Sequence, residues 1–403
     1  MSARTRSIWL ANAPVQPARP TLTGTHTADV VVIGAGICGT STALALAHEG
    51  VDVVWLEAGR VAFEATGRNA GFILQGTAER YDRAVALMGR ERARTVHALS
   101  IENHHRIART IQQHGLDCGY RMRGSLQLAG TPREEDELRT SAAWLAEDGF
   151  EAEVWSAAQL PPALASRGYR MGVFLPADGE LDPVRFIRGA AHIATQQGVR
   201  LFENSPVQAL HAPAPGDVAV HTAGGTVHAQ LAVVCTNAKA GQLLGLCAHT
   251  VDPVRGQMLA TAPAPKGTFP IPIYADHGYD YWRQLPDGRI VLGGWRNLDP
   301  SAEVGHTDVL HATIQDRMTA FVRSFPGLEN LPIEHRWSGT MGFSRDGLPL
   351  VGPAPGAPGA LVGAGFTGHG FGFAWRSGEA LARVVLDGRD PLVDVLSPAR
   401  LRT

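Results

Sequence analysis

Residues 29–39 read DVVVIGAGICG, an apolar run that ends in three glycines with the spacing GxGxxG. A helical stretch from Ser41 to His48, a turn at Gly50 and a second apolar run from Val51 to Glu57 follow directly. Strand, glycines, helix, strand and terminal carboxylate therefore occur in the order of a complete strand–helix–strand unit. Such a unit is typical of folds that bind the ADP half of a dinucleotide. The full context makes this prediction more specific than the glycine spacing alone.

The three glycines and the acid each have a separate physical role. Gly34 permits the tight turn out of the strand, Gly36 lets the backbone approach a pyrophosphate, and Gly39 lets the helix pack closely on the sheet. The first turn of the helix offers unpaired N–H groups and a partial positive charge to the phosphates. Glu57 is expected to accept hydrogen bonds from the ribose hydroxyls. Its charge would repel a 2′-phosphate, so NADP is not expected at this site.

The same glycine spacing recurs in residues 360–370, which read ALVGAGFTGHG. After Gly370 the apolar residues follow a helical period as far as Leu386, so Asp387 is expected to end a helix and not a strand. One interpretation is a strand-to-helix turn that needs close packing. The other, which we favour, is a second helix N-terminus that faces another part of the same cofactor.

Length and composition are those of a globular enzyme. The 403 residues suit two joined domains, and 44% of them are hydrophobic and 18% charged. The formal net charge of −2 gives no reason to expect nucleic acid or an acidic membrane as a partner. No apolar run reaches membrane-spanning length, and prolines interrupt residues 1–27, where we expect no signal peptide.

Cysteines and histidines show no metal-ligand pattern. The four cysteines form no CxxC pair, so neither a disulfide framework nor a zinc site is expected. Cys38 lies in the glycine motif and Cys235 in an apolar strand. His104 and His105 lie in a polar helical stretch, where we expect both to be solvated. We therefore predict no metal and a reduced, cytoplasmic setting.

Between the glycine motifs, helical and strand patterns alternate. A polar loop of small residues, Thr66 to Asn69, is suited to wrapping an extended ligand. Helical patterns cover residues 81–113, 133–148 and 184–197, and residues 231–235 read as a buried parallel strand. Stretches 256–260, 278–284 and 289–295 read as antiparallel strands, with a turn at 286–288. This sheet, rich in aromatics and arginine, can form the wall of a substrate pocket.

These segments resemble the D-amino-acid oxidase superfamily of FAD-dependent amine oxidoreductases, which includes glycine oxidase, sarcosine oxidase and gamma-glutamylputrescine oxidoreductase. The resemblance covers residues 7 to about 390. It is carried by TGRNAG at 66–71, PVRGQM at 253–258, YWRQLPDGR at 281–289, GTMGFSRDGLPLVG at 339–352 and GFTGHG at 365–370. The N-terminal extension and the TGRNAG segment make the putrescine-type branch the nearest in appearance.

The resemblance implies an α/β fold, α+β overall, with a Rossmann-like FAD-binding domain and an antiparallel-sheet substrate domain. After an N-terminal extension at 1–27, residues 28–90, 160–250 and 336–403 would form the FAD-binding domain. Residues 91–159 and 251–335 would form the substrate-binding domain.

FAD is implied in an extended pose, with the pyrophosphate at Gly34, Gly36 and Gly39, the ribose at Glu57, and the adenine at Val207. The segment Gly368 to Phe371 would lie beside the pyrimidine edge of the flavin, where amides at a helix start can stabilise negative charge. The implied cofactor contacts are Gly34, Gly36, Ile37, Cys38, Gly39, Glu57, Ala58, Arg60, Thr66, Gly67, Arg68, Asn69, Ala70, Gly71, Val207, Thr236, Asn237, Gly342, Gly368, His369, Gly370 and Phe371.

The sequence also departs from the sarcosine oxidases in three places. They hold the substrate carboxylate with a lysine at the position of Gly372, and they carry a second lysine for oxygen activation on a strand that matches residues 289–294, which contain none. They attach flavin through a cysteine in the region that matches 339–346, which also contains none. FAD is therefore expected to be noncovalent, and neither the sarcosine manner of binding nor efficient use of oxygen follows from the resemblance.

The implied reaction is oxidation of a C–N bond in a primary or secondary amine or amino acid. Hydride passes from the α carbon to flavin N5, and the resulting imine is hydrolysed by water. We predict that His369, Tyr281 and Arg283 are catalytic and that Trp295, Arg296, Trp337 and Phe371 bind the substrate. The alternative for Arg283 is an ion pair with a surface acid, and for the two tryptophans it is core packing.

Other interpretations remain open. An NAD-dependent dehydrogenase would need an acid–base pair in a second domain, which we do not find. A flavoprotein acting on tRNA would need a basic tract, which is missing. A flavin-binding subunit, or a dehydrogenase that passes electrons to a partner in place of oxygen, is compatible with the sequence. Expected partners are thus a small amine and oxygen or another acceptor, and the protein is a monomer or a homo-oligomer.

Overall fold

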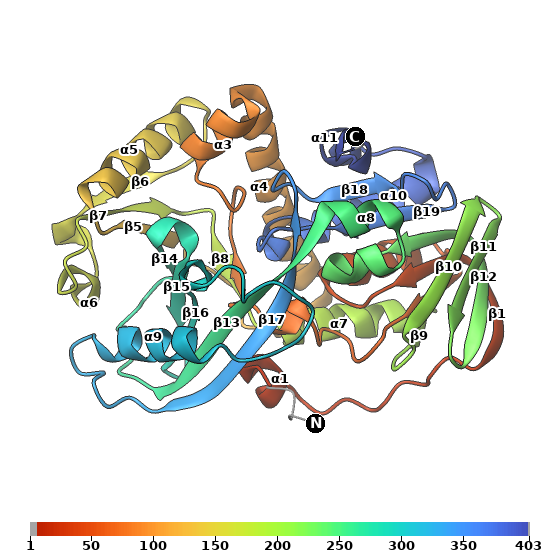
Figure 1. Ribbon diagram of the computed structural model, residues 1–403, viewed down its shortest axis with the longest axis horizontal. Coiled ribbons are helices and arrows are strands. Elements are labelled where there is room, and N and C mark those ends of the chain that lie inside the picture. Colours follow the sequence, from red (N-terminus) through yellow and green to blue (C-terminus); the bar gives the residue numbers. More distant parts are fainter. Residues whose placement is uncertain (1–5, 402–403) are drawn as a thin grey trace.

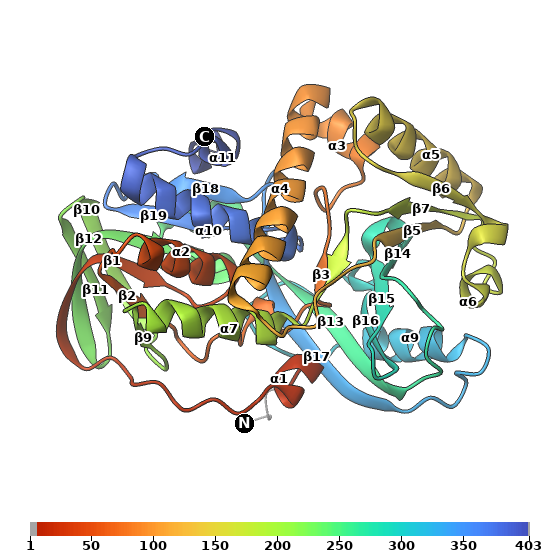
Figure 2. The ribbon, with the colours of Figure 1, turned by 180° about the vertical axis from the view of Figure 1, so that it is seen from behind.

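The computed structural model describes residues 6–401, and Figures 1 and 2 show it from opposite sides. Two large sheets lie beside each other, one on the right and one on the left of Figure 1. The long strands β13 (Val251–Pro263) and β17 (Ile333–Ser344) run through the middle of the molecule. Helix α4 (Arg90–His114) lies between the two halves in Figure 2.

The first sheet contains the strand–helix–strand unit predicted from the sequence. Its parallel strands follow the spatial order β19 (Ala360–Ala364), β12 (Gly225–Val234), β1 (Gly24–Ile33), β2 (Val53–Leu56) and β9 (Arg200–Phe202). Three antiparallel strands, β10 (Val207–Ala214), β11 (Asp217–Thr222) and β18 (Leu350–Pro353), extend it. Strand β1 is central, with Val32 paired to Trp55 on one side and to Val233 on the other.

Both faces of the first sheet are buried along β2 and along the carboxyl-terminal parts of β1 and β12, which explains why these segments are apolar without alternation. Val30 and Val32 pack in the cluster that includes helices α2 (Ile37–His48), α7 (Pro183–Gln196) and α10 (Gly370–Asp387), which cover this face in Figure 2. Val31 and Ile33 point the other way, into a separate cluster with residues of β11 and β12. The expected helix at the C-terminal glycine motif is confirmed, because α10 does end at Asp387.

The second sheet follows the order β17, β13, β16 (Arg289–Gly294), β15 (Asp280–Gln284), β14 (Ile273–Ala275), β5 (Ser125–Ala129), β7 (Met171–Leu175) and β6 (Glu153–Ser156). Its neighbouring strands are antiparallel except for the pair β14 and β5. The predicted turn joins β15 to β16, with Gly288 at a φ of 97°. Strands β7 and β17 are part of this sheet, although most of their residues lie in ranges that the sequence assigned to the FAD-binding domain.

Alternation along the strands of the second sheet divides its side chains between two faces. Trp282 and Leu292 pack with Phe321 of helix α9 (Ala312–Arg323). Tyr281 and Met258 lie on the other face, against the cluster that contains α2 and α10. This face is turned toward the first sheet, so the site that both sheets share lies here.

The remaining elements connect or cover the two sheets. They are α1 (Ile8–Asn12), α3 (Tyr81–Met88), α5 (Pro132–Glu147), α6 (Pro162–Ala165), α8 (Gly245–Thr250), α11 (Pro391–Leu396), and the short strands β3 (Phe72–Ile73), β4 (Arg121–Met122) and β8 (Gly179–Glu180). Two helices, α3 and α4, replace the single pattern predicted over 81–113, because Gly89 between them takes a φ of 82°.

The described part of the N-terminal extension packs against the polar loop at residues 66–71. The Ser7 hydroxyl donates to the carbonyl of Gly67, and the Trp9 indole donates to the carbonyl of Asn69 at 2.7 Å. Within residues 6–401, no helix has the length and apolar character needed to cross a bilayer.

The expectation that His104 is solvated was wrong. Its side chain is buried, and Nδ1 lies 2.7 Å from the carbonyl oxygen of Ala177. Burial lowers the pKa of His104 to about 4, so the ring is neutral near neutral pH. His105, the next residue of the helix, is exposed as expected.

Candidate active site

A cavity of about 470 Å³ extends from the carboxyl ends of the first sheet to the inner face of the second. Open α/β sheets bind ligands at the carboxyl ends of their strands, where backbone turns leave polar groups free. The cavity is lined at one end by residues of the first glycine motif and at the other by Tyr274, Tyr281 and Phe371. Its length fits an extended ligand better than a compact one.

The first glycine motif forms a close-packed turn at one end of the cavity. A Cβ on Gly39 would lie 1.9 Å from the carbonyl oxygen of Gly34, so a glycine is required there. Helix α2 begins after Gly36, which caps it without a side chain, and Gly36 itself lines the cavity. Among the first N–H groups of the helix, that of Ile37 donates to Thr66 Oγ1 at 3.1 Å, and the capping glycine places no side chain of its own over the others.

Glu57 stands at the tip of β2 and lines the same end of the cavity. Its carboxylate accepts hydrogen bonds from the backbone N–H groups of Ala35 and Gly59, both at 2.7 Å. Burial raises its pKa, and the two backbone donors oppose this shift. The carboxylate is thus held rigidly in a position from which it can also accept hydrogen bonds from a ligand.

The second glycine motif places another helix N-terminus beside the first. Helix α10 begins at Gly370, has no side-chain cap, and lies so close to α2 that a Cβ on Gly370 would be 3.7 Å from Ile37 Cδ1. Farther along, Ser41 donates to the carbonyl of Trp375 at 2.5 Å. Two partial positive charges therefore converge on one cavity, which supports the interpretation that we favoured from the sequence.

The loop from Thr66 to Gly71 follows the cavity wall and is fixed by its own hydrogen bonds. Thr66 Oγ1 accepts from the backbone of Ile37 at 3.1 Å, and Asn69 bonds the carbonyl of Thr66 and the N–H of Gly71, both at 2.7 Å. Arg68 donates to the carbonyl of Ser338 at 2.9 Å and pairs with Asp308. The loop is therefore rigid before any ligand binds.

Aromatic side chains form the far end of the cavity. The rings of Tyr274 and Tyr281 are stacked, with centroids 5.5 Å apart, and Phe72 lies edge-on to Tyr281. Burial raises the pKa of Tyr281 to about 12, so its hydroxyl is protonated. Met258 and Phe371 complete this apolar wall.

His369 and Arg296 are the polar groups of this end. Burial lowers the pKa of His369 to about 4, and the charge of Arg296 adds to this effect, so the imidazole is neutral. Its Nδ1 has no hydrogen-bond partner among residues 6–401. The Arg296 guanidinium lies over the rings of Tyr279 and Phe343, with Cζ 4.6 and 5.0 Å from their centroids.

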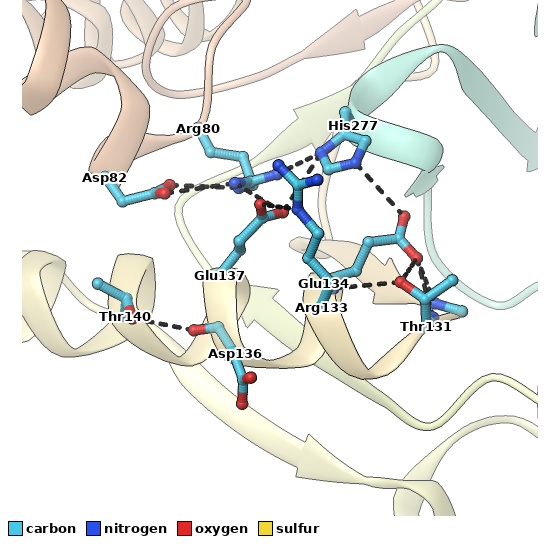
Figure 3. Close-up of polar contacts among 10 residues, drawn as sticks. Arg80, Asp82, Thr131, Arg133, Glu134, Asp136, Glu137, Thr140 and His277 are labelled. Atoms are coloured by element: carbon cyan, nitrogen blue, oxygen red, sulfur yellow. Dashed lines mark hydrogen bonds and ion pairs between the residues drawn. The ribbon is translucent and has the colours of Figure 1, made fainter.

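A cluster of charged residues stands beside this end of the cavity (Figure 3). Arg80 bonds Asp82, Glu137 and His277, and His277 also lines the cavity. A small side cavity of about 50 Å³ opens here and shares His277 with the main one. The cluster thus joins helices α3 and α5 to the turn at residues 276–278.

Glu134, Asp276 and His277 hold possible metal-ligand atoms within 4.8 Å of one another. One Glu134 oxygen accepts the hydrogen bonds of the α5 capping box from Thr131, which gives that carboxylate a structural role (Figure 3).

The structure brings most of the predicted site residues to the cavity. Those that line it are Gly34, Gly36, Ile37, Cys38, Glu57, Ala58, Thr66, Arg68, Asn69, Ala70, Val207, Thr236, Asn237, Tyr281, Arg296, Gly368, His369, Gly370 and Phe371. The two cysteines of the wall, Cys38 and Cys235, form no disulfide, and the Cys235 thiol donates a hydrogen bond to the Cys38 sulfur at 3.6 Å.

Other predicted cofactor residues support the wall from behind. Arg60 pairs with Glu203 at 2.9 Å, and a Cβ on Gly67 would lie 2.1 Å from the Ala62 carbonyl oxygen. Gly71 and Gly342 are similarly crowded. A Cβ on Gly71 would lie 2.4 Å from the Leu181 carbonyl oxygen, and a Cβ on Gly342 would lie 2.6 Å from Asn237 Oδ1. With Gly39, these residues shape the cavity without lining it.

Three predicted catalytic or substrate residues do not line the cavity. Arg283 is buried beside it, pairs with Glu180 at 3.2 Å and donates to the Leu181 carbonyl at 2.8 Å. Trp295 turns to the opposite face of its sheet and packs on Phe321. Trp337 is fully buried, and its indole donates to the carbonyl of Arg68 at 2.8 Å. The two tryptophans have the packing role that the sequence left open as the alternative, whereas Arg283 pairs with a buried acid and not with a surface one.

Sequence reasoning missed several residues of the aromatic end. Tyr274, Tyr279 and Phe343 line the cavity, as do Met258 and Met341. Tyr274 is opposite Tyr281 in the ladder of β14 and β15, and this pairing was the available signal. No short-range pattern marked the other residues, because they come from separate strands and turns.

Residues 29–384 match the model of the DAO family, described as FAD dependent oxidoreductase. The chain belongs to this family. Its fold is accordingly that of the family's flavoproteins, with a Rossmann-like FAD-binding region, and its cofactor is FAD.

Named relatives agree with this assignment. The probable oxidoreductase OrdL of Haemophilus influenzae is 29% identical over 91% of this chain and 85% of its own length. The gamma-glutamylputrescine oxidoreductase of Escherichia coli K12 is 27% identical over 96% of this chain and 90% of its own. The solved structure of glycine oxidase from Geobacillus kaustophilus has a TM-score of 0.80 at 21% identity, over 94% of this chain and 100% of that one. The protein is an FAD-dependent oxidoreductase of a family that acts on amines and amino acids.

The cavity residues fit FAD. Two helix N-termini without side-chain caps suit its charged pyrophosphate and flavin edge, and the buried Glu57 suits a ribose. Thr236 Oγ1 is buried at the wall without a partner among residues 6–401, so a ligand has a free hydroxyl to bond.

Proposed function

We propose that the protein oxidises the C–N bond of a primary or secondary amine or amino acid at the aromatic end of the cavity. The observation that supports this is a single cavity with cofactor-binding features at one end and a largely aromatic chamber, with Arg296 and His369 as its polar groups, at the other. A substrate that enters the chamber lies next to the α10 N-terminus, where the flavin ring is expected. The chamber and the cofactor site are therefore continuous.

Bound FAD supplies an acceptor for two electrons and a hydride at N5. The chain's own residues position and desolvate the substrate. Tyr281, Phe371 and Met258 exclude water from the reacting carbon and favour the neutral amine over the ammonium form. Neutral His369 can accept or donate a hydrogen bond through its free Nδ1, and the α10 N-terminus stabilises negative charge next to it.

No strong base is needed in this proposal. The tyrosines are protonated, and burial lowers the pKa of His369 to about 4, which makes the ring a weak base and favours departure of the α hydrogen with its electron pair over its removal as a proton. The oxidised product is an imine, which water converts to a carbonyl compound and an amine or ammonia. Arg283 takes no direct part, because Glu180 and two backbone carbonyls occupy its guanidinium.

Electrons then leave to oxygen or to another acceptor. The sequence has no lysine on β16, where the resemblance implies one for oxygen activation, and relatives include proteins named as dehydrogenases. We propose noncovalent FAD, since β17 carries no cysteine, and a reduced cytoplasmic setting that suits four free cysteines. The expected state of assembly is a monomer or a homo-oligomer.

The test is anaerobic reduction of the purified holoenzyme by a panel of amines. The panel pairs each carboxylate-bearing amine with a carboxylate-free analogue of the same length. We expect one class to bleach the flavin band, and readmitted air then separates an oxidase from a dehydrogenase by the rate of reoxidation. A flavin band that no amine bleaches contradicts the proposed reaction. Denaturing the holoenzyme and passing it through an ultrafiltration membrane checks whether the flavin is noncovalent, because a noncovalent flavin then passes into the filtrate.

A further inference from the structure

We propose that Arg296 is the specificity-determining anchor of the substrate end and that the amine substrate carries a carboxylate, which Arg296 binds. The proposal rests on the proposed function, because it names the class of amine. It differs from the carboxylate site that the resemblance implies, which would use a side chain at position 372.

Arg296 is placed in the cavity wall by the turn that follows β16. Trp295 takes a φ of 56°, a left-handed conformation that reverses the chain direction, and packs on the α9 side of the sheet. Arg296, the next residue, lines the cavity and opens a short helical turn, Arg296–Leu298. A non-glycine residue in this conformation is uncommon, so packing of the tryptophan maintains the turn that presents the arginine.

The guanidinium is held by aromatic rings and not by acids. Its Cζ lies 4.6 Å from the Tyr279 ring and 5.0 Å from the Phe343 ring. Within residues 6–401 it forms no ion pair and donates no hydrogen bond. A cation held through such contacts keeps its N–H donors free, and their fork matches the two oxygens of a carboxylate.

The other cationic side chains that line the cavity are engaged elsewhere. Lys239 pairs with Glu64 at 3.0 Å, and Arg68 pairs with Asp308 at 3.3 Å. His277 bonds Arg80, and His369 is neutral. Arg296 is thus the cavity-lining arginine or lysine of the described chain that has no acidic partner. One uncompensated positive charge matches a monoanion, which favours a carboxylate over a phosphate dianion.

The opposite wall cannot supply the anchor. Gly372 lines the cavity on α10, and a Cβ there would lie only 2.8 Å from the carbonyl oxygen of Leu74. A lysine at this position would need the backbone to move. The charge that recognises an anion therefore comes from the β16 side, and the substrate is oriented with its carboxylate toward that side.

The experiment measures binding of simple carboxylates to the oxidised holoenzyme by calorimetry, without turnover. The probes are acetate and benzoate, each compared with its amide at constant ionic strength. We expect the wild type to bind each carboxylate more tightly than its amide. Arg296→Gln should weaken carboxylate binding by roughly tenfold to a hundredfold, the range for one charge-assisted pair, and leave amide binding unchanged.

Two further variants keep the test decisive. Arg296→Lys retains the positive charge but loses the forked pair of N–H donors, so its carboxylate affinity should lie between those of the wild type and Arg296→Gln. Arg109→Gln removes the same charge from the exposed face of α4 and should behave as wild type. If Arg296→Gln fails to fold, the lysine variant still reports on the anchor.

Equal binding of carboxylate and amide by the wild type, or a carboxylate preference that survives Arg296→Gln, overturns the proposal. The two proposals fail separately. A carboxylate preference in an enzyme whose flavin no amine bleaches would leave the anchor standing and remove the proposed reaction. Flavin bleaching by amines without any carboxylate preference would do the reverse.

Discussion

Replacing Arg283 should reduce stability and leave ligand selectivity unchanged, although the sequence placed this residue in the active site. Its guanidinium pairs with Glu180 at 3.2 Å, donates to the carbonyls of Gly71 and Leu181, and lies over the Trp9 ring. Arg283→Met keeps an unbranched side chain that reaches about as far as the arginine Nε, and it removes the charge and all of these hydrogen bonds. The change therefore isolates the polar contribution of the residue.

The expected loss in the free energy of unfolding follows from Glu180, the partner that the substitution leaves buried. Removing one member of a buried ion pair typically costs about 3–5 kcal/mol, because the other charge stays buried without compensation. Glu180 also pairs with Arg121, so we expect the low end, about 3 kcal/mol. In domains of 150–250 residues, 1 kcal/mol corresponds to roughly 2–4 °C in Tm. A fall of several degrees is therefore expected.

The assay compares Arg283→Met with Arg296→Met in excess FAD. Thermal unfolding followed by circular dichroism gives Tm, and calorimetric titration with benzoate gives the carboxylate affinity. Arg283→Met should lower Tm and keep the benzoate affinity. Arg296→Met should keep Tm and weaken the benzoate affinity. An Arg283→Met protein with wild-type Tm and weakened benzoate binding would refute the structural assignment of Arg283.

Three further predictions concern packing, pH and reactivity. Gly39→Ala should abolish FAD binding, seen as loss of flavin absorbance per protein, because its Cβ would lie 1.9 Å from the Gly34 oxygen. Burial lowers the pKa of His104 to about 4, so the unfolded chain binds more protons than the folded one between that pH and about 6.5. Stability from neutral His104 is thus lost as pH falls through this window, and His104→Gln should lose less Tm than wild type from about pH 7 to about pH 5. A hydrogen bond from Cys235, together with burial, raises the pKa of Cys38, so iodoacetamide should not label Cys38 or Cys235 in the native protein and should label both after unfolding. Labelling of the native pair at the rate of the unfolded chain would contradict this.

The strand–helix–strand unit was predictable because its determinants are local. The turn at Gly34 and the close approach of Gly39 to the Gly34 oxygen involve residues only a few positions apart. The apolar run of β1 reports burial on both faces, which the structure has. Helix α10 was predictable for the same reason, since its 3.6-residue period is contained in one continuous segment.

The substrate end was harder to predict because strand alternation gives a side chain's face but not what meets it. Tyr281 and Arg283 share a face of β15, as the period of two requires. Tyr281 lines the cavity, whereas Arg283, two residues farther along, meets Glu180 and the docked N-terminal helix. Both placements agree with the same sequence pattern, so only the packing of β8 and α1 against β15 separates them.

The sequence by itself determined the cofactor end of this protein: the glycine turns, the acid at the tip of β2 and the helix after each glycine motif. These features depend on backbone sterics and hydrogen bonding over a few residues, which local residue types control. Only the tertiary structure decided that the N-termini of α2 and α10 converge and that Arg296 faces the cavity while Arg283 is neutralised behind it. The physical reason is that a charge is either free or compensated according to which distant segment packs against it, and no local pattern encodes that partner.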